Sequence, residues 1–386
     1  MKNRDIIIIG NQNFYLDPEE KDNSISIAKE LAKRNRVFFV CPPLNRKISQ
    51  TQVSKKKGLI KDSRNLWFFK PRTTLYSING IIFKLFNFLI KKNTIRFVKE
   101  ILAEINNLKI SDFIIIDDNH LFRSTYLKEL LKPSLYIYYL KSNLSYISNK
   151  ETKVSKTEIA LLKQVDIILT NHKYMVDVVR TYNKNTYHIR QACDSNLYSH
   201  EVFRIVPKEL GSLLTPIIGY IGVLDSDILD IDLIEYLAVN NPLWTFLFIG
   251  SQKKNFCNSR LYRYKNISFI ENKKPEELPD YIQFFDIAIH PQRVNNFITE
   301  NYQKRITEYL AMGKHVITTN TVVIQEFKDM VYISNSHDQF LHNIELALKS
   351  DNQDEKIKRR NFAKKNSWSE SANIIYRCVD EYKLNS

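Results

Sequence analysis

The sequence predicts an α/β protein made of two doubly wound parallel sheets in series. Short apolar runs alternate with longer segments of helical spacing, which is the pattern of βαβ units. This pattern stops in a polar connection around residues 193–216 and then starts again. A chain of 386 residues also exceeds what one core usually holds. We therefore expect an N-terminal domain over residues 1–195 and a C-terminal domain over 196–386, and the last helix can pack back on the N-terminal domain.

In the first half, the run Asp5–Ile9 ends at Gly10, as expected of a buried parallel strand followed by a tight turn. Pro42 and Pro43 stop the next strand, and the polar, lysine-rich segment 47–63 is expected to be an exposed loop. Strands are predicted at 5–9, 37–40, 66–69, 113–116, 135–140, 167–169 and 187–189, and helices at 24–34, 81–105, 122–131, 155–163 and 173–182.

In the second half, Gly250 ends one predicted strand and Gly313 stands at the C-terminal cap of a predicted helix. Strands are predicted at 217–223, 244–249, 267–270, 287–290, 315–319 and 331–333, and helices at 231–239, 276–284 and 302–312, before three final helices. In this architecture ligands bind outside the carboxyl ends of the strands, which here would line a crevice between the two domains.

The composition excludes several classes of protein. Hydrophobic residues make up 44% and charged residues 26%, so disordered and collagen-like chains are excluded. The longest apolar runs are shorter than the roughly 18–20 residues of a transmembrane helix, and the start of the chain lacks a signal-peptide pattern. We expect a cytoplasmic protein. The four cysteines are far apart, which predicts free thiols rather than disulfides or a zinc site.

The charge is distributed unevenly along the chain. Residues 1–200 contain 34 basic and 18 acidic side chains, whereas the remainder is nearly neutral within a total net charge of +15. Such asymmetry is typical of a surface that meets phosphate-rich partners, and nucleic acid, anionic lipid and a phosphorylated acceptor all fit it.

Two glutamates, Glu300 and Glu308, stand eight positions apart around a predicted helix start. This spacing puts them on roughly one side of the helix, about two turns apart. Glu300 would lie at the mouth, where a helix N-terminus can take a diphosphate, and Glu308 deeper, where it can accept hydrogen bonds from a ribose diol. Spacing alone favours a non-functional alternative, in which the helix dipole favours the N-terminal glutamate and the second glutamate is unrelated and exposed.

The surrounding residues resemble the E-x7-E region of GT-B glycosyltransferases, especially family 4 of the retaining enzymes. Residues 310–316 (LAMGKHV) follow the second half of that motif closely. Further stretches are similar to other segments of that family, namely 192–198, 219–222, 247–250, 269–279 and 285–291. The resemblance covers most of residues 190–380 and extends to the first half only in architecture.

The resemblance implies a GT-B fold of two Rossmann-like domains facing a central cleft. The C-terminal domain would bind a UDP- or GDP-sugar as donor, the N-terminal domain would bind the acceptor, and neither a permanently bound cofactor nor a metal would be needed. It also implies a site. The candidate catalytic residues are Glu300, Asp118 and His120, and the candidate donor-binding residues are Glu308, Lys304, Arg293, Asn301, Tyr302, Gly250, Gly222 and Asn11.

The chain departs from the family pattern at three places. Asn301 and Gln303 replace glycines of the diphosphate loop, and the Arg and Lys expected after strand 217–223 are absent. Arg293, Lys304 or Arg305 would then meet the phosphate charge, with Lys304 preferred because it lies one turn past Glu300. The acceptor-domain histidine has no counterpart after strand 135–140, where residues 141–143 read Lys-Ser-Asn.

Three other features leave alternatives open. Residues 117–120 follow a strand and can contact the acceptor or cap a turn, while Asp225-Ser226-Asp227 is expected to cap a helix rather than bind a metal. The helix beginning at residue 81 places Lys84, Asn87 and Lys91 on one stripe of an otherwise apolar surface. It is either an interfacial helix on an anionic membrane or a buried helix of the first domain.

Together these observations predict a cytoplasmic glycosyltransferase, peripheral at the inner membrane face if the helix touches lipid. A lipid-linked or polysaccharide acceptor in cell-envelope glycan synthesis would account for the cationic half. A nucleotide-sugar epimerase of the same fold is the enzymatic alternative, and a noncatalytic carbohydrate- or nucleic-acid-binding protein is the alternative from another class. Few aromatic–basic interleavings of the nucleic-acid-binding kind occur, and no nucleic-acid partner is expected.

Overall fold

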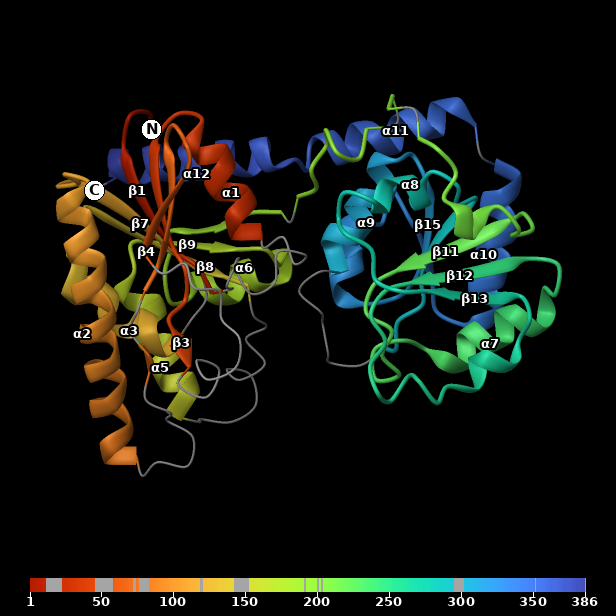
Figure 1. The fold of residues 1–386 in the computed structure, drawn as a ribbon, viewed down its shortest axis with the longest axis horizontal. Coiled ribbons are helices and arrows are strands. Elements are labelled where there is room, and N and C mark those ends of the chain that lie inside the picture. Colours follow the sequence, from red (N-terminus) through yellow and green to blue (C-terminus); the bar gives the residue numbers. More distant parts are fainter. Residues whose placement is uncertain are drawn as a thin grey trace. The chain divides into compact units, whose positions relative to one another are not determined.

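A computed structural model describes most of the chain (Figure 1). The described residues are 1–11, 23–45, 58–71, 74–75, 83–118, 121–141, 153–190, 192–199, 201–202, 204–294, 302–350 and 352–385. They form two compact units. Unit 1 comprises Met1–Arg190 together with Trp368–Ser386, and unit 2 comprises Gln191–Ser367.

In the described part of unit 1, eight strands form one sheet in the order β10-β9-β8-β7-β1-β2-β5-β4. The strands are β1 (Asp5–Ile9), β2 (Arg36–Val40), β4 (Gly58–Ser63), β5 (Leu66–Lys70), β7 (Phe113–Asp118), β8 (Leu135–Leu140), β9 (Ile167–Thr170) and β10 (Thr186–His188). Neighbours pair in parallel except β4, which runs antiparallel to β5. Two short strands, β3 (Leu44–Asn45) and β6 (Thr74–Leu75), pair separately. The parallel order confirms the predicted doubly wound architecture.

Strand β4 corrects the prediction of an exposed loop over 47–63. Leu59 pairs with Phe69 and packs against the core of unit 1, whereas Lys61 to Ser63 are exposed. Only half of this edge strand is apolar, so its sequence has no alternation strong enough to indicate a strand. The rest of that predicted loop, residues 47–57, lies outside the described residues.

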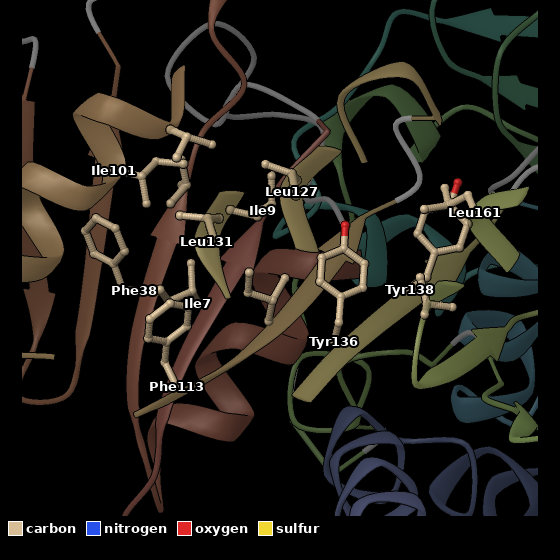
Figure 2. Close-up of a cluster of buried hydrophobic side chains, with 14 of the residues drawn as sticks. Ile7, Ile9, Phe38, Ile101, Phe113, Leu127, Leu131, Tyr136, Tyr138 and Leu161 are labelled. Carbon is tan, nitrogen blue, oxygen red and sulfur yellow. The ribbon is translucent and has the colours of Figure 1, made fainter. Parts of the chain in front are cut away.

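Helices cover both faces of this sheet. They are α1 (Asn23–Ala32), α2 (Phe83–Asn107), α3 (Leu121–Leu131), α5 (Lys153–Gln164), α6 (Lys173–Arg180) and α12 (Trp368–Asn385). On one face, Ile7 and Ile9 pack with Ile101 of α2 and Leu127 of α3 (Figure 2). Residues 6–9 are all at most 1% exposed, as a central parallel strand covered on both faces requires.

The C-terminal helix α12 belongs to unit 1 although it follows unit 2 in the chain. It packs against α1 and β9. The Asn35 side-chain amide donates a hydrogen bond to the Tyr376 hydroxyl at 3.2 Å, and the Tyr382 hydroxyl donates to Asp166 at 3.3 Å. These contacts tie the last helix to the sheet that begins at residue 5.

In the described part of unit 2, six parallel strands form a sheet in the order β13-β12-β11-β14-β15-β16. They are β11 (Ile217–Ile221), β12 (Thr245–Ile249), β13 (Ile267–Ile270), β14 (Ile287–His290), β15 (His315–Thr319) and β16 (Tyr332–Ser334). This is the strand order of a dinucleotide-binding Rossmann sheet. In such a sheet, successive strands are first added on one side of the first strand and then on its other side. The switch point, where ligands bind in such sheets, therefore lies between β11 and β14, and the corresponding point of unit 1 lies between β1 and β7.

The helices of unit 2 flank this sheet. They are α7 (Ile231–Asn240), α8 (Leu278–Ile282), α9 (Tyr302–Ala311), α10 (His337–Ser350) and α11 (Gln353–Lys364), with short 3₁₀ turns at Lys208–Leu210, Arg260–Arg263 and Val322–Phe327. Ile234 of α7 and Ile344 of α10 pack with Ile218 of β11 in one core cluster. Helix α8 is shorter than predicted and begins at Leu278 rather than at residue 276. This start places Pro279 in the first turn, the part of a helix that tolerates proline.

The segment Asp225–Asp227 does not cap a helix, contrary to the sequence prediction. Asp230 is the N-cap of α7, and its carboxylate accepts a hydrogen bond from the backbone N–H of Leu233 at 3.1 Å. Asp225 instead accepts from the N–H of Asp227 at 2.8 Å and closes a turn. A cap side chain must stand directly before the first helical turn to reach its N–H groups, and Asp227 lies too early for that.

Two glycines meet at the carboxyl ends of β11 and β12. Gly250 has φ of +154°, and a Cβ atom there would lie 1.8 Å from the carbonyl oxygen of Gly222. The N–H of Gly222 donates to Ile249 O and that of Gly250 to Ile270 O, both at 3.0 Å. These two predicted donor-binding positions therefore have a structural requirement of their own, because only glycine permits this approach of the loops.

We expect Gly250→Ala to lower the free energy of unfolding by about 3 kcal/mol, since it adds both a steric overlap and an unfavourable backbone conformation. Gly211→Ala is the matched control, because Gly211 has φ of −63° and its nearest neighbouring atom would be 3.5 Å from the new Cβ. That control should change the free energy by less than about 1 kcal/mol. Urea denaturation followed by circular dichroism measures the free energy of unfolding of both variants. Equal effects of the two substitutions would contradict a specific requirement for glycine at position 250.

Candidate functional site

Helix α9 brings a buried ion pair to the switch point of unit 2. Glu308 and Arg305 lie one turn apart on this helix, and the Arg305 guanidinium Nη1 contacts Glu308 Oε2. The side chain of Glu308 is 3% exposed and that of Arg305 is 21% exposed. The Tyr198 hydroxyl also hydrogen-bonds to Glu308, and burial together with this carboxylate raises the pKa of Tyr198. Glu308 is thus an acceptor with two partners already in place.

Tyr309 and His290 fix this pair relative to the sheet. The Tyr309 hydroxyl accepts a hydrogen bond of 2.7 Å from the backbone N–H of Ile221, the last residue of β11. His290 ends β14, and its ring packs edge-on against Tyr220 with a centroid distance of 5.6 Å. Burial, with Arg305 nearby, lowers the pKa of His290 to about 3, so this imidazole is neutral at pH 7. The cluster therefore spans β11, β14 and α9, where the strand order reverses.

Two other candidate donor-binding residues, Lys304 and Arg293, are more exposed than Glu308. Lys304 is half-buried and acts electrostatically on the buried thiol of Cys193, whose pKa is raised chiefly by burial. Arg293 is exposed, and its backbone N–H donates to Ile228 O at 2.8 Å. Of the remaining predicted residues, Tyr302 is described only as the first backbone residue of α9. Glu300, Asn301 and His120 lie outside the described residues.

A second polar cluster lies at the carboxyl edge of unit 1. Asp118 ends β7, is 1% exposed and forms an ion pair of 2.7 Å with Lys141 Nζ, directly after β8. Ser24, in the first turn of α1, donates to Asp118 and accepts from Lys141 Nζ at 2.9 Å. The candidate catalytic residue Asp118 is thus held in a closed network of three side chains.

Asp117 occupies the switch point of unit 1 beside Asp118. It accepts a hydrogen bond from the Tyr136 hydroxyl, and burial raises its pKa against the opposing effects of Arg123, Ser124 and Tyr136. Arg123 Nη2 donates to the carbonyl oxygen of Gly10 at 2.9 Å and so bridges towards β1. Asn11, the next residue along the chain, is exposed at this edge. The switch points of both units therefore carry an arginine near a buried carboxylate, and this arginine is buried in unit 1 and partly exposed in unit 2.

Sequence reasoning missed the partners rather than the acids. Ser24, Lys141 and Tyr198 were not among the candidates, although each contacts one of the predicted carboxylates. Lys141 could have been found from its place directly after a strand at the carboxyl edge. Ser24 and Tyr198 have no such signal, because each is brought to its carboxylate by the packing of a distant segment.

Among the described residues, no three His, Cys, Asp or Glu side chains gather as a metal site would require. None of the helices described is both long and apolar enough to cross a membrane.

Comparison with solved structures shows the fold that these two units define. The chain matches sucrose-phosphate synthase of Thermosynechococcus elongatus with a TM-score of 0.70 at 13% identity, covering 100% of both chains. It matches Anabaena Alr3699/HepE in complex with UDP and glucose with a TM-score of 0.67 at 14% identity, covering 98% of this chain and 100% of that one. The catalytic domain of Arabidopsis thaliana starch synthase IV bound to ADP and acarbose gives 0.65 at 11% identity, over 99% of each. The predicted GT-B fold is confirmed.

Comparison by sequence adds one curated relative. The chain is 28% identical over 255 residues to the Bacillus subtilis (strain 168) protein named "Putative teichuronic acid biosynthesis glycosyltransferase TuaH". The match spans 63% of this chain and 62% of the relative. No family model matches the chain. These comparisons confirm the resemblance to GT-B glycosyltransferases that the sequence predicts.

A further buried acid lies in unit 1. Glu158 on α5 is 6% exposed and acts electrostatically on Tyr138, and burial raises its pKa to about 7. A raised pKa in the folded state means that the folded protein holds this proton more tightly than the unfolded chain. The contribution of Glu158 to the free energy of unfolding is therefore fully present below its unfolded-state pKa of about 4.5. It is lost as the pH rises through the folded-state pKa of about 7.

We therefore expect Glu158→Gln, which is neutral at every pH, to gain stability relative to wild type between pH 4.5 and 8, by up to about 3 kcal/mol. Urea denaturation of both proteins across this range gives the difference directly. Glu104→Gln, at a partly exposed position of α2, is the control and should show little change. A difference for Glu158→Gln that does not vary with pH would contradict the burial of a titrating acid.

Proposed function

We propose that this protein is a glycosyltransferase that moves a sugar from a nucleoside diphosphate sugar to an acceptor hydroxyl. The observation that carries the proposal is the buried Glu308, held on α9 at the switch point of unit 2, in a segment of E-x7-E pattern. A carboxylate in this position can accept both hydroxyls of a ribose in bidentate fashion. Glu300 would act at the reacting sugar, and Asn301, Tyr302, Lys304 and Arg293 would line the donor.

Unit 1 would bind the acceptor, with Asp118 and His120 as its candidate catalytic residues and Asn11 at the same edge. The excess of basic residues in the first 200 positions of the chain suits an acceptor that carries phosphate, such as a lipid-linked glycan. The name of the Bacillus relative refers to teichuronic acid biosynthesis, which supports an envelope polysaccharide as the product class. We infer a retaining reaction from the resemblance to family 4. The donor would be a UDP- or GDP-sugar, and UDP is the nucleotide in the HepE complex.

A thermal-shift screen against UDP, GDP, ADP, CMP and dTDP tests the donor class. A nucleotide present at about 100 times its dissociation constant should stabilise the folded protein by about 2.7 kcal/mol, and one nucleotide should stand out. No response to any of them would overturn the transferase proposal. Conversion of a nucleotide sugar to its epimer without an acceptor would favour an epimerase of the same fold instead.

Glu308→Gln should weaken binding of the selected nucleotide by about 10- to 100-fold, the loss of one charged hydrogen bond. Glutamine keeps the shape and an acceptor for Tyr198, whereas alanine would leave Arg305 buried without its partner and confound folding with binding. Glu300→Gln is the matched comparison and should reduce turnover more than affinity. Calorimetry and initial rates on both variants decide it, and wild-type affinity in Glu308→Gln would show that the donor site is elsewhere.

The exposed face of α2 supports peripheral attachment to an anionic membrane. Phe88 is 60% exposed, and Lys92, Arg96 and Lys99 are exposed at spacings of four and three residues along the helix. The opposite face is core, because Phe97 and Ile101 are buried in unit 1. The helix thus has the buried face of one predicted alternative and an exposed basic face that would suit the other. The Lys91 ammonium already lies near Glu129 and over the Tyr126 ring, while Lys84 and Asn87 have side chains outside the described residues.

Sedimentation with liposomes should rise with phosphatidylglycerol content and fall with salt. Replacing Lys92, Arg96 and Lys99 with Gln should weaken binding at least tenfold, given about 1 kcal/mol for each basic residue near the surface. The control replaces three exposed lysines with Gln and removes the same charge, namely Lys358 and Lys364 of α11 and its C-cap residue Lys365. Equal losses in both triple variants, or equal binding to neutral vesicles, would refute a specific face.

A further inference from the structure

The Arg305–Glu308 pair has features that helix stability does not explain. Arg305 is the N-terminal partner, which is the less favourable order because a helix dipole favours anions near its start. Both charges are largely removed from water, with exposed fractions of 21% and 3%, and such burial often costs more than the pair returns. An apolar pair would serve α9 at least as well, so the charges point to a use in binding.

Arg305 is also the cation best placed between Glu308 and solvent. The loop after β11, residues 222–230, contains no Lys or Arg. Arg293 is exposed in the loop after β14, and Lys304 acts on Cys193. Arg305, in contrast, contacts the buried carboxylate, influences His290 at the end of β14 and still has part of its side chain in water. A guanidinium carries five N–H donors, more than Glu308 can use.

We propose that Arg305 binds the diphosphate of the donor and, by turning towards it, releases Glu308 to bind the ribose. This inference rests on the proposed function. In the structure described here Arg305 satisfies Glu308, so that neither charge is buried alone. A nucleoside diphosphate supplies both an anion for Arg305 and hydroxyls for Glu308, and it can therefore replace the pair completely. A nucleoside without phosphate supplies only the hydroxyls and would have to separate the pair without offering Arg305 another anion.

The two ligands should therefore respond differently to loss of the guanidinium. In Arg305→Gln, affinity for UDP, or for whichever nucleoside diphosphate the screen selects, should fall by about 10- to 100-fold. Affinity for the corresponding nucleoside should stay the same or rise, because Glu308 no longer has to give up a charged partner. Arg305→Lys should retain part of the preference for the diphosphate, since lysine keeps the charge but not the planar fork.

Calorimetry with both ligands on wild type, Arg305→Gln, Arg305→Lys and Lys304→Gln measures these effects, with circular dichroism to verify folding. Because Arg305→Gln leaves Glu308 without its ion pair, the double variant Arg305→Gln/Glu308→Gln provides a second route. Compared with Glu308→Gln alone, it removes the guanidinium from a background that has no buried carboxylate. A fall in diphosphate affinity at least as large is expected there, because no carboxylate is freed to offset the loss of the guanidinium.

The proposal is overturned if Arg305→Gln weakens diphosphate and nucleoside by the same factor, or if the diphosphate preference is lost in Lys304→Gln and kept in Arg305→Gln. Both results require that wild type binds the nucleoside diphosphate, so they refute the role of Arg305 while the proposed function stands. A wild-type protein that binds no nucleotide refutes the proposed function and this inference together.

Discussion

Parallel strand pairing is the constraint on which both candidate sites depend. In a parallel sheet every strand ends at the same edge, and each crossover helix returns the chain to the opposite one. The carboxyl ends of β1, β7 and β8 in unit 1, and of β11 and β14 in unit 2, are therefore neighbours although they are far apart in the sequence. Where the winding reverses, no crossover helix fills the space directly above the edge. Polar side chains gather at these two positions.

The two edges manage buried charge in a similar way. Asp118 is paired with Lys141 in unit 1, and Glu308 is paired with Arg305 in unit 2, and a hydroxyl group from another segment hydrogen-bonds to each carboxylate. A lone buried carboxylate would be protonated or would destabilise the fold, so each acid needs its cation. Removing one partner from such a pair is costly, which is why substitutions that preserve shape are needed to separate binding from folding.

The difference between the units lies in how tightly each pair is enclosed. Lys141 and Asp118 have side chains 8% and 1% exposed, and Ser24 contacts both of them. Arg305, at 21%, reaches solvent while its partner does not. A partly exposed guanidinium can exchange one anion for another without leaving a charge buried alone. This asymmetry supports the proposal that Arg305 can change partners in a donor site of unit 2, whereas the network of unit 1 is more fully enclosed.

Much of the architecture could be predicted from sequence alone, because it follows from local patterns. Short apolar runs such as residues 6–9 can be satisfied only in a strand covered on both faces, and Gly313 ends a helix through its own backbone freedom. The spacing of Glu308 within its motif is equally local. Edge strand β4 was not predicted, because only half of it shows the apolar pattern of a strand. The N-cap Asp230 was not predicted either, because Asp225 and Asp227 stand close before it and are equally suitable cap residues by sequence.

Which side chains contact the carboxylates of the two sites was decided by tertiary structure. Ser24, Lys141 and Tyr198 reach their partners only when segments distant in the sequence come together. Arg305 and Glu308 are neighbours on one helix, but their burial, which sets the strength of the charge interaction, exists only in the folded protein.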